Sequence, residues 1–452
     1  MDIKREVNRK KYIWRFILLV TFVTFLFVFK LFVIRYLEDF YNRQEIGHYL
    51  KSELETEIKR NIGKDSCINL QQITIEVKGT DKFQRIIDSI YAKNYQYDMD
   101  KFLYYLGLKD NQFNNLLMPK MDYLKGTDGK GDDVWIKLAG GQLDHFDSHM
   151  PTYRIKSKKP IIEGCKKVNL FHPKARNGAV NESFSLFLLK ENGLIALKNG
   201  NVTLILNHDT IGAYYYQEHP TLSLGAHHNR ENGVVIRLKH LNGKRLRIAN
   251  IYQSKKVNKT LIFREQLDHI EKMISKYNAR EIDASEIFSI RKLAKLWSIV
   301  NLVNGYHGAE IRNMYFYFNP EDSLLEPVAR EFSNIYFDPA GSFSEGPPLY
   351  YLKVKRFNRK EYRKIFDVYY LSDKSESLLR YLINTDLQEF TEKSYLESIF
   401  KKYSNELKSI QQCTYKEYPI FSSFDKNHFY DNQDLIRKFL IDEVSGEEKL
   451  GN

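Results

Sequence analysis

A long apolar segment near the N-terminus limits what this chain can fold into more than any other feature. The segment runs from Phe16 to Ile34 and carries a single charged residue, Lys30. As a helix it would extend roughly 28 Å, which is about the thickness of the hydrocarbon core of a bilayer. A helix of this kind has no polar face to offer water, so the sequence predicts that it lies in a membrane.

The residues on either side of this segment favour a permanent anchor over a cleaved signal peptide, which is the alternative interpretation. No small-residue cleavage site follows it; the charged stretch Arg35–Glu38 continues the helix instead. Basic residues dominate positions 1–15, and basic flanks stay on the cytoplasmic side. We therefore expect a single-pass protein that is held in the bilayer through residues 16–34, with its N-terminus in the cytoplasm and its main domain outside.

Composition excludes several other classes of protein. The net charge is +12, but the basic N-terminus supplies part of it and the rest is spread without a dense patch, so we expect no nucleic-acid partner. The three cysteines, Cys67, Cys165 and Cys413, are too few and too far apart for a disulfide framework or a thiolate zinc site. At most one disulfide can form, and the sequence leaves its pairing open.

Hydropathy patterning divides the chain into a basic tail (1–15), an anchor (16–35), a stalk helix (36–68) and one large domain (69–452). Within that domain, residues 69–260 are rich in predicted strands and residues 261–452 in predicted helices. The glycine- and aspartate-rich stretch 126–133 is expected to be a loop. Strands are expected at Leu70–Val77, Val134–Leu138, Thr152–Ser157, Lys166–Pro173, Leu194–Lys198, Val202–Leu206, Ile211–Tyr216, Val234–Leu238, Leu246–Tyr252, Met314–Phe318 and Leu324–Val328, and helices at Asp81–Lys93, Lys101–Leu124, Asn181–Asn192, Leu261–Tyr277, Ala284–Asn304, Glu376–Asn384 and Ser394–Ile410.

Three blocks of sequence carry a family resemblance. The first contains DVWIKLAGG (Asp133–Gly141), PTYRIK (Pro151–Lys156) and EGCKKVNLFHPKARN (Glu163–Asn177). The second is NGLIALKNGNVTLILNHDTIGAYYYQEH (Asn192–His219), and the third is Asn304–Glu331, with RNMYFYFNP and LLEPV at its centre. Together these blocks resemble the spore coat protein H (CotH) kinase family, in a divergent branch, from about Ile73 to the C-terminal helices.

The resemblance implies a fold and an activity. The expected fold class is α+β, with an N-terminal transmembrane helix followed by a two-lobed atypical kinase-like fold that has a mixed or antiparallel sheet and a helical C-terminal part. The expected activity is transfer of phosphate from a nucleotide to a hydroxyl on an envelope protein or polysaccharide, with ATP and Mg²⁺ or Mn²⁺ as cofactors. The alternative is a catalytically inactive kinase-fold scaffold that binds components of the cell envelope.

The same resemblance assigns roles to six residues. Arg154, Lys156 and Glu218 would organise the nucleotide phosphates, Asn313 and Glu331 would hold the metal, and His307 would act with Glu331 in catalysis by positioning the acceptor hydroxyl. Five of these six residues have a plainer alternative. Arg154 and Lys156 alternate along a strand and fit a solvated face. Glu218 fits a turn cap, Glu331 a surface charge and His307 a hydrogen-bonded structural histidine. His307 stands where the family has its catalytic aspartate, and no second acid follows Glu331, which departs from the family pattern.

Overall fold

The computed structural model describes residues 70–92, 121–172, 179–332, 371–404 and 429–437, with gaps inside these ranges at 141–144, 147–149, 223, 242–244, 304, 306–307, 309–310, 312, 393, 431–432 and 435. The chain divides into two compact units, Met1–Asp65 and Ser66–Asn452. All described residues belong to the second unit. The expected anchor and stalk helix lie outside the described residues. So does His307, in a separate gap.

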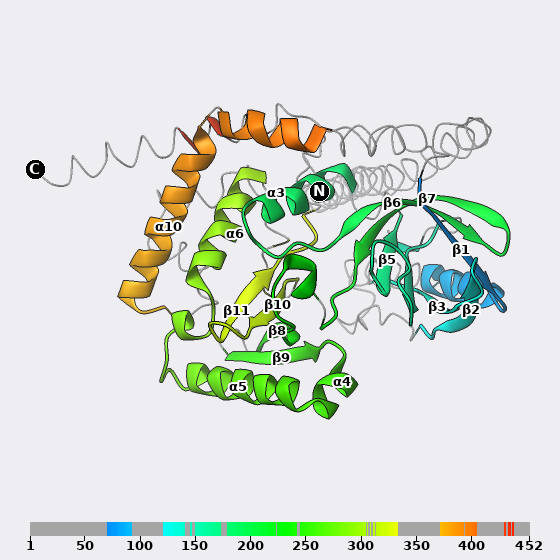
Figure 1. Ribbon diagram of the computed structural model, residues 1–452, viewed down its shortest axis with the longest axis horizontal. Coiled ribbons are helices and arrows are strands. Elements are labelled where there is room, and N and C mark those ends of the chain that lie inside the picture. Colours follow the sequence, from blue (N-terminus) through cyan, green and yellow to red (C-terminus); the bar gives the residue numbers. More distant parts are fainter. Residues whose placement is uncertain are drawn as a thin grey trace, which may run out of the picture. The chain divides into compact units, whose positions relative to one another are not determined.

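Seven strands close into a barrel in the order β1-β2-β3-β4-β5-β7-β6 (Figure 1). Neighbouring strands pair antiparallel, except that β1 and β6 pair in parallel, with Gln72 opposite Thr203. This parallel pairing joins the first strand to the sixth and removes both edges of the sheet. The strands are β1 (Gln72–Val77), β2 (Leu124–Asp128), β3 (Asp133–Leu138), β4 (Tyr153–Ser157), β5 (Lys167–Phe171), β6 (Asn199–Leu206) and β7 (Asp209–Glu218).

Alternation along the strands fills the barrel with apolar side chains. Ile75, Ile136, Ile155, Val168 and Leu204 are fully buried and come from five different strands. Their neighbours in sequence therefore point outward, because successive side chains of a strand lie on opposite faces. The helical residues 81–92 add three more buried side chains to this core, Phe83, Ile87 and Ile90.

Two glycines allow the barrel to close. A Cβ atom at Gly126 of β2 would lie 2.2 Å from the carbonyl oxygen of Glu76 on β1, so only glycine permits this approach. Gly212 of β7 has a φ of +139°, in a region that favours glycine, beside the irregular pairing at Leu204/Ile205 of β6. The sequence predicts a loop around Gly126, but residues Leu124–Asp128 form β2. Glycine is present here because β1 and β2 approach closely, not because the chain turns.

A second sheet has four strands in the order β11-β10-β8-β9. Figure 1 shows α5 running along β9, and α10 lying beside α6. Helix α6 also packs on β11 and α3. The elements are α3 (Ala179–Glu191), η4 (Ala226–His228), β8 (Val235–Leu241), β9 (Arg245–Ile251), α4 (Ser254–Lys259), α5 (Leu261–Asn278), η5 (Ala284–Glu286), α6 (Ile290–Val303), β10 (Tyr315–Asn319), β11 (Leu324–Val328) and α10 (Asp373–Thr391).

The expected α+β, two-lobed kinase-like fold with a mixed sheet and a helical C-terminal part is wrong. Within the expected sheet-rich stretch 69–260, seven strands form a closed barrel, because β6 returns to pair with β1, and β8 and β9 are not part of it. The second sheet joins β8 and β9 to β10 and β11, although α5 and α6 separate the two pairs of strands along the chain. It therefore combines strands from both expected lobes. No helix within the described ranges has the length and apolarity needed to cross a bilayer.

Barrel closure at Gly126 gives a first prediction. We expect Gly126→Ala to lower the free energy of unfolding by about 1–3 kcal/mol, because the added methyl group overlaps the Glu76 carbonyl and forces β1 and β2 apart. Gly129→Ala is the matched control, since its Cβ would meet only the Thr74 side chain at 3.3 Å. Chemical denaturation of both variants measures the difference, and equal stabilities would contradict the role of Gly126 in closure.

Candidate functional site

Four cationic side chains gather on the outer surface of the barrel. Lys137 of β3 lies opposite Arg154 of β4, and Lys156 of β4 lies opposite Lys167 of β5. All four are half-buried, and each follows or precedes a buried residue of its strand, which places its side chain on the outward face. We call Lys137, Arg154, Lys156 and Lys167 the cationic face. The sequence had predicted two of its members, Arg154 and Lys156, and the structure brings them together.

In the part of the chain that the structure describes, little negative charge balances the cationic face; the charge of Asp122 raises the pKa of Lys137 without forming an ion pair with it. No ion pair within 4 Å joins any of its four side chains to a described carboxylate, although other surface lysines such as Lys125 and Lys159 do form such pairs. Neighbouring strands lie about 5 Å apart, so these cations repel one another at close range. An anion bound among these cations would relieve the repulsion.

The like charges also change protonation. Burial, followed by the charges of Arg154, Lys137 and Lys156, lowers the pKa of Lys167 to about 8. Burial is again the first cause of the lowered pKa of Lys137, and Arg154 is the second. An anion bound on this face would oppose both shifts, because it favours the charged amine.

Two aromatic rings border the cationic face. The ammonium of Lys156 lies 4.1 Å from the ring centre of Tyr123 and 5.4 Å from that of Trp135, and Lys137 lies 5.1 Å from Tyr123. These cation–π contacts hold the lysine side chains over the rings. Arg154 is fixed differently, since its Nε donates a 2.7 Å hydrogen bond to Oδ1 of Asn169. The face is therefore a positioned set of charges.

A buried polar row continues from the cationic face toward the second sheet. Asn169 of β5 lies opposite Gln217 of β7, and both side chains are buried. Gln217 donates from Nε2 to Oε1 of Glu182, on helix α3, over 2.8 Å. The same oxygen accepts the backbone N–H of Glu331 over 2.9 Å. Glu182 thus connects the barrel with the segment that follows β11.

The segment after β11 brings a fifth cation close to this row. The guanidinium of Arg330 lies 4.7 Å from the ring centre of Tyr315, its Nε donates to the carbonyl of Asn313 over 2.8 Å, and it forms an ion pair with Glu331. Glu331 has a φ of +64°, which is unusual for a residue with a side chain and places local strain here. Arg330 keeps its charge, because the neighbouring tyrosines and acids raise its pKa despite the opposing effect of burial.

The buried imidazole of His219 faces the same group of charges. Burial, together with Arg154, Lys167 and Arg330, lowers the pKa of His219 well below its ordinary value. Its ring packs edge-on against Tyr252 at 5.3 Å. His219 is therefore neutral near pH 7 and adds no charge to the cationic face.

The structure places Glu218 away from the cationic face. Glu218 lies opposite Val168, whose side chain points into the barrel. The side chain of Glu218 therefore points to the inner face of the sheet, whereas that of Arg154 points to the outer face. Its Oε1 lies 2.8 Å from Nδ1 of His227, and its Oε2 accepts a 3.3 Å hydrogen bond from the backbone N–H of Lys198. These contacts do not support the expected role of Glu218 in organising nucleotide phosphates.

The two residues expected to bind metal lie close together around Arg330. Arg330 contacts the Asn313 backbone and the Glu331 carboxylate, so the Glu331 oxygens face a guanidinium. No group of three or more histidine, cysteine, aspartate or glutamate side chains suited to a metal ion occurs among the described residues. Asn313 and Glu331 by themselves supply fewer oxygen ligands than the octahedral geometry of Mg²⁺ requires.

Sequence reasoning missed Lys137, Lys167, Glu182 and Arg330. Lys137 and Lys167 carried no signal of their own, because their proximity to Arg154 follows from strand register. Glu182 did carry one: it is an acid within the largely apolar stretch AVNESFSLFLLKE, and it is fully buried. A charged residue on the apolar side of a helix is a sign of a buried polar site.

Comparison of the chain with models of known protein families gives no match, and a search of curated proteins finds no similar sequence. The resemblance to the CotH kinase family therefore stays an expectation that depends on the quoted motifs alone.

Glu182 gives a prediction about the buried row. We expect Glu182→Leu to lower the free energy of unfolding by about 2–4 kcal/mol, because Gln217 Nε2 and the Glu331 N–H would both lose their acceptor in a buried setting. Glu182→Gln keeps an acceptor oxygen and should cost less. Chemical denaturation compares the two, and a Leu variant as stable as the Gln variant would contradict the bridging role.

Lys167 gives a prediction about pH. The unfolded chain keeps Lys167 protonated up to its ordinary pKa of 10.5, whereas the folded chain releases the proton near pH 8. Between these values the unfolded state binds more protons, so Lys167 makes the protein more stable as pH rises through that window. Thermal unfolding of wild type and Lys167→Met across the window measures the contribution. The exposed Lys158→Met is the control, and it should keep the wild-type slope.

Proposed function

We propose that the chain binds a phosphate-bearing ligand on its cationic face and transfers a phosphate group from a nucleotide to a hydroxyl on an envelope protein or polysaccharide. One observation carries the binding part of this proposal: four half-buried cations on adjacent strands form no ion pair with any carboxylate that the structure describes. The transfer part depends on the resemblance to the CotH kinase family.

The chemistry of the cationic face fits phosphate oxygens. A guanidinium such as that of Arg154 can donate two parallel hydrogen bonds to a phosphate, and lysine ammonium groups act as point charges around it. Arg154 is already oriented by Asn169, so little freedom is lost when a ligand binds. The rings of Tyr123 and Trp135 beside the lysines offer a planar surface against which the remainder of a nucleotide can pack.

Phosphate transfer asks little covalent chemistry of a protein. The acceptor oxygen forms the new bond to phosphorus, the bond to the nucleoside diphosphate breaks, and the hydroxyl proton is released. Positioning and stabilisation of negative charge supply most of the catalysis. Arg154, Lys137 and Lys167 would provide that charge. The roles of His307 in positioning the hydroxyl, and of Asn313 and Glu331 toward a metal, stay predictions.

The ion pair between Glu331 and Arg330 favours a second candidate function, that of a scaffold. The Glu331 carboxylate is paired with Arg330, and the described residues provide no set of metal ligands. A protein in this state can hold a phosphate-bearing envelope polymer on the cationic face without turnover. This scaffold function shares the binding site with the enzyme and lacks only the reaction.

Calorimetric titration of the full-length protein with ATP, and separately with pyrophosphate, tests the binding site. We expect Arg154→Ala and Lys167→Met to weaken binding by about tenfold or more, as the loss of a charged hydrogen bond or ion contact predicts. Lys158→Ala removes an exposed lysine just beyond β4 and should bind as wild type does. Wild type that binds neither compound would contradict both candidate functions.

Turnover then separates the enzyme from the scaffold. Release of nucleoside diphosphate from ATP in the presence of Mg²⁺ or Mn²⁺ and an envelope fraction would support transfer, provided that Arg154→Ala abolishes it. Binding of pyrophosphate without any release of diphosphate would favour the scaffold.

A further inference from the structure

The corner between α4 and α5 exposes two large aliphatic side chains next to each other. Leu261 is 59% and Ile262 is 56% exposed, and they form the first turn of α5. Leaving such side chains in water forgoes the free energy that their burial would contribute. Adjacent exposed aliphatic residues on a helix therefore point to a partner surface.

These two side chains are not displaced members of the core. Val257 of α4 and Phe263 of α5 are buried and already hold both helices to the domain. The backbone between the helices is also fixed, since the N–H of Thr260 donates to the carbonyls of Lys256 and Val257 over 3.1 and 3.3 Å. The corner thus presents Leu261 and Ile262 from a rigid support.

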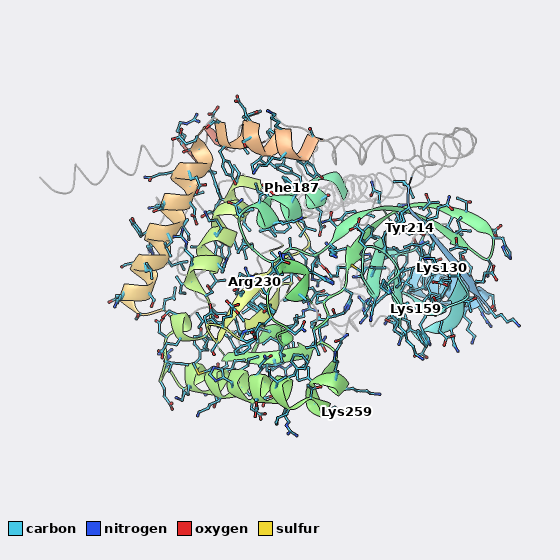
Figure 2. All side chains as sticks on the ribbon, in the orientation of Figure 1. Lys130, Lys159, Phe187, Tyr214, Arg230 and Lys259 are labelled. Atoms are coloured by element: carbon cyan, nitrogen blue, oxygen red, sulfur yellow. The ribbon has the colours of Figure 1, made fainter. Side chains whose placement is uncertain are left out.

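Cations surround the exposed pair. Lys255, Lys256, Lys259 and Arg264 are exposed, and none of them forms an ion pair within the described ranges. Figure 2 shows Lys259 projecting away from the ribbon at this corner. Two exposed acids also belong to α5: Glu265, which lies one turn after Leu261 and Ile262, and Asp268, about one turn further on. The four exposed cations at this corner therefore outnumber the acids two to one.

We propose that this corner is a membrane-docking surface for anionic lipids. Leu261 and Ile262 enter the boundary between headgroups and acyl chains, and Lys255, Lys256 and Lys259 contact the headgroup phosphates. This combination of apolar residues with flanking cations is what interfacial lipid binding requires. It differs from the predicted anchor at residues 16–34 and from the cationic face of the barrel.

A lipid surface fits this corner better than a protein partner does. Two side chains offer little apolar area, whereas a stable protein interface covers about 800 Å² on each partner. A bilayer needs only a few inserted side chains, because each nearby cation adds about a fivefold gain in affinity for an anionic surface. Charge complementarity therefore selects anionic lipid as the occupant.

Site-specific fluorescence tests the proposal on the full-length chain. Ile262→Cys carries an environment-sensitive fluorophore, with Cys67 and Cys413 changed to serine; Cys165 is buried and stays. The protein is reconstituted in phosphatidylcholine vesicles with or without phosphatidylserine. The matched control carries the fluorophore at Lys130→Cys, an exposed position in the turn between β2 and β3.

We expect a blue shift and quenching by lipid-borne nitroxide at position 262 in the vesicles that contain phosphatidylserine, and neither at position 130. Reversal of Lys255, Lys256 and Lys259 to glutamate should reduce the inserted fraction by about fivefold or more for each residue changed. Insertion unchanged by this reversal, or absent with phosphatidylserine, would overturn the proposal. So would a blue shift in detergent that grows with protein concentration, which would identify a second copy of the chain as the occupant.

Discussion

The parallel pairing of β1 with β6 is the constraint on which the rest of the structure depends. It joins Gln72 to Thr203 across a long stretch of chain and turns a sheet with two edges into a closed barrel. Closure fixes the register of every strand, and register decides which side chains share a face. Within the closed sheet, the pairing of β4 with β3 and with β5 places Arg154 beside Lys137 and Asn169. The cationic face is therefore a product of barrel geometry and not of any local motif.

Electrostatic repulsion on that face works against stability. Burial, and after it the charges of Arg154, Lys137 and Lys156, lower the pKa of Lys167, which means that the folded state holds this proton less firmly than the unfolded state does. Natural proteins tolerate such arrangements where a ligand later neutralises them. The well-packed apolar interior, with Ile75, Ile136 and Ile155 fully buried, is what offsets this repulsion.

Local elements could be read from the sequence, whereas their assembly could not. The structure confirms the strands predicted at Val134–Leu138 and Leu324–Val328. It also confirms the helix predicted at Leu261–Tyr277. The strand expected at Leu194–Lys198 is irregular backbone, and β2 was missed because Gly126 and its neighbours resemble a turn. Two of the four cations, Arg154 and Lys156, were found through the resemblance. The others, and Glu182, required register and tertiary contact, which no single segment encodes.

The oxygen that Glu182 shares between Gln217 and the Glu331 N–H has a thermodynamic consequence. A movement of β7 that lengthens one of these bonds changes the position of the acceptor for the other. Loss of this oxygen would therefore disturb both the Gln217 side chain on β7 and the backbone at residue 331, where φ is positive. One carboxylate oxygen thereby joins the barrel to the segment that follows β11.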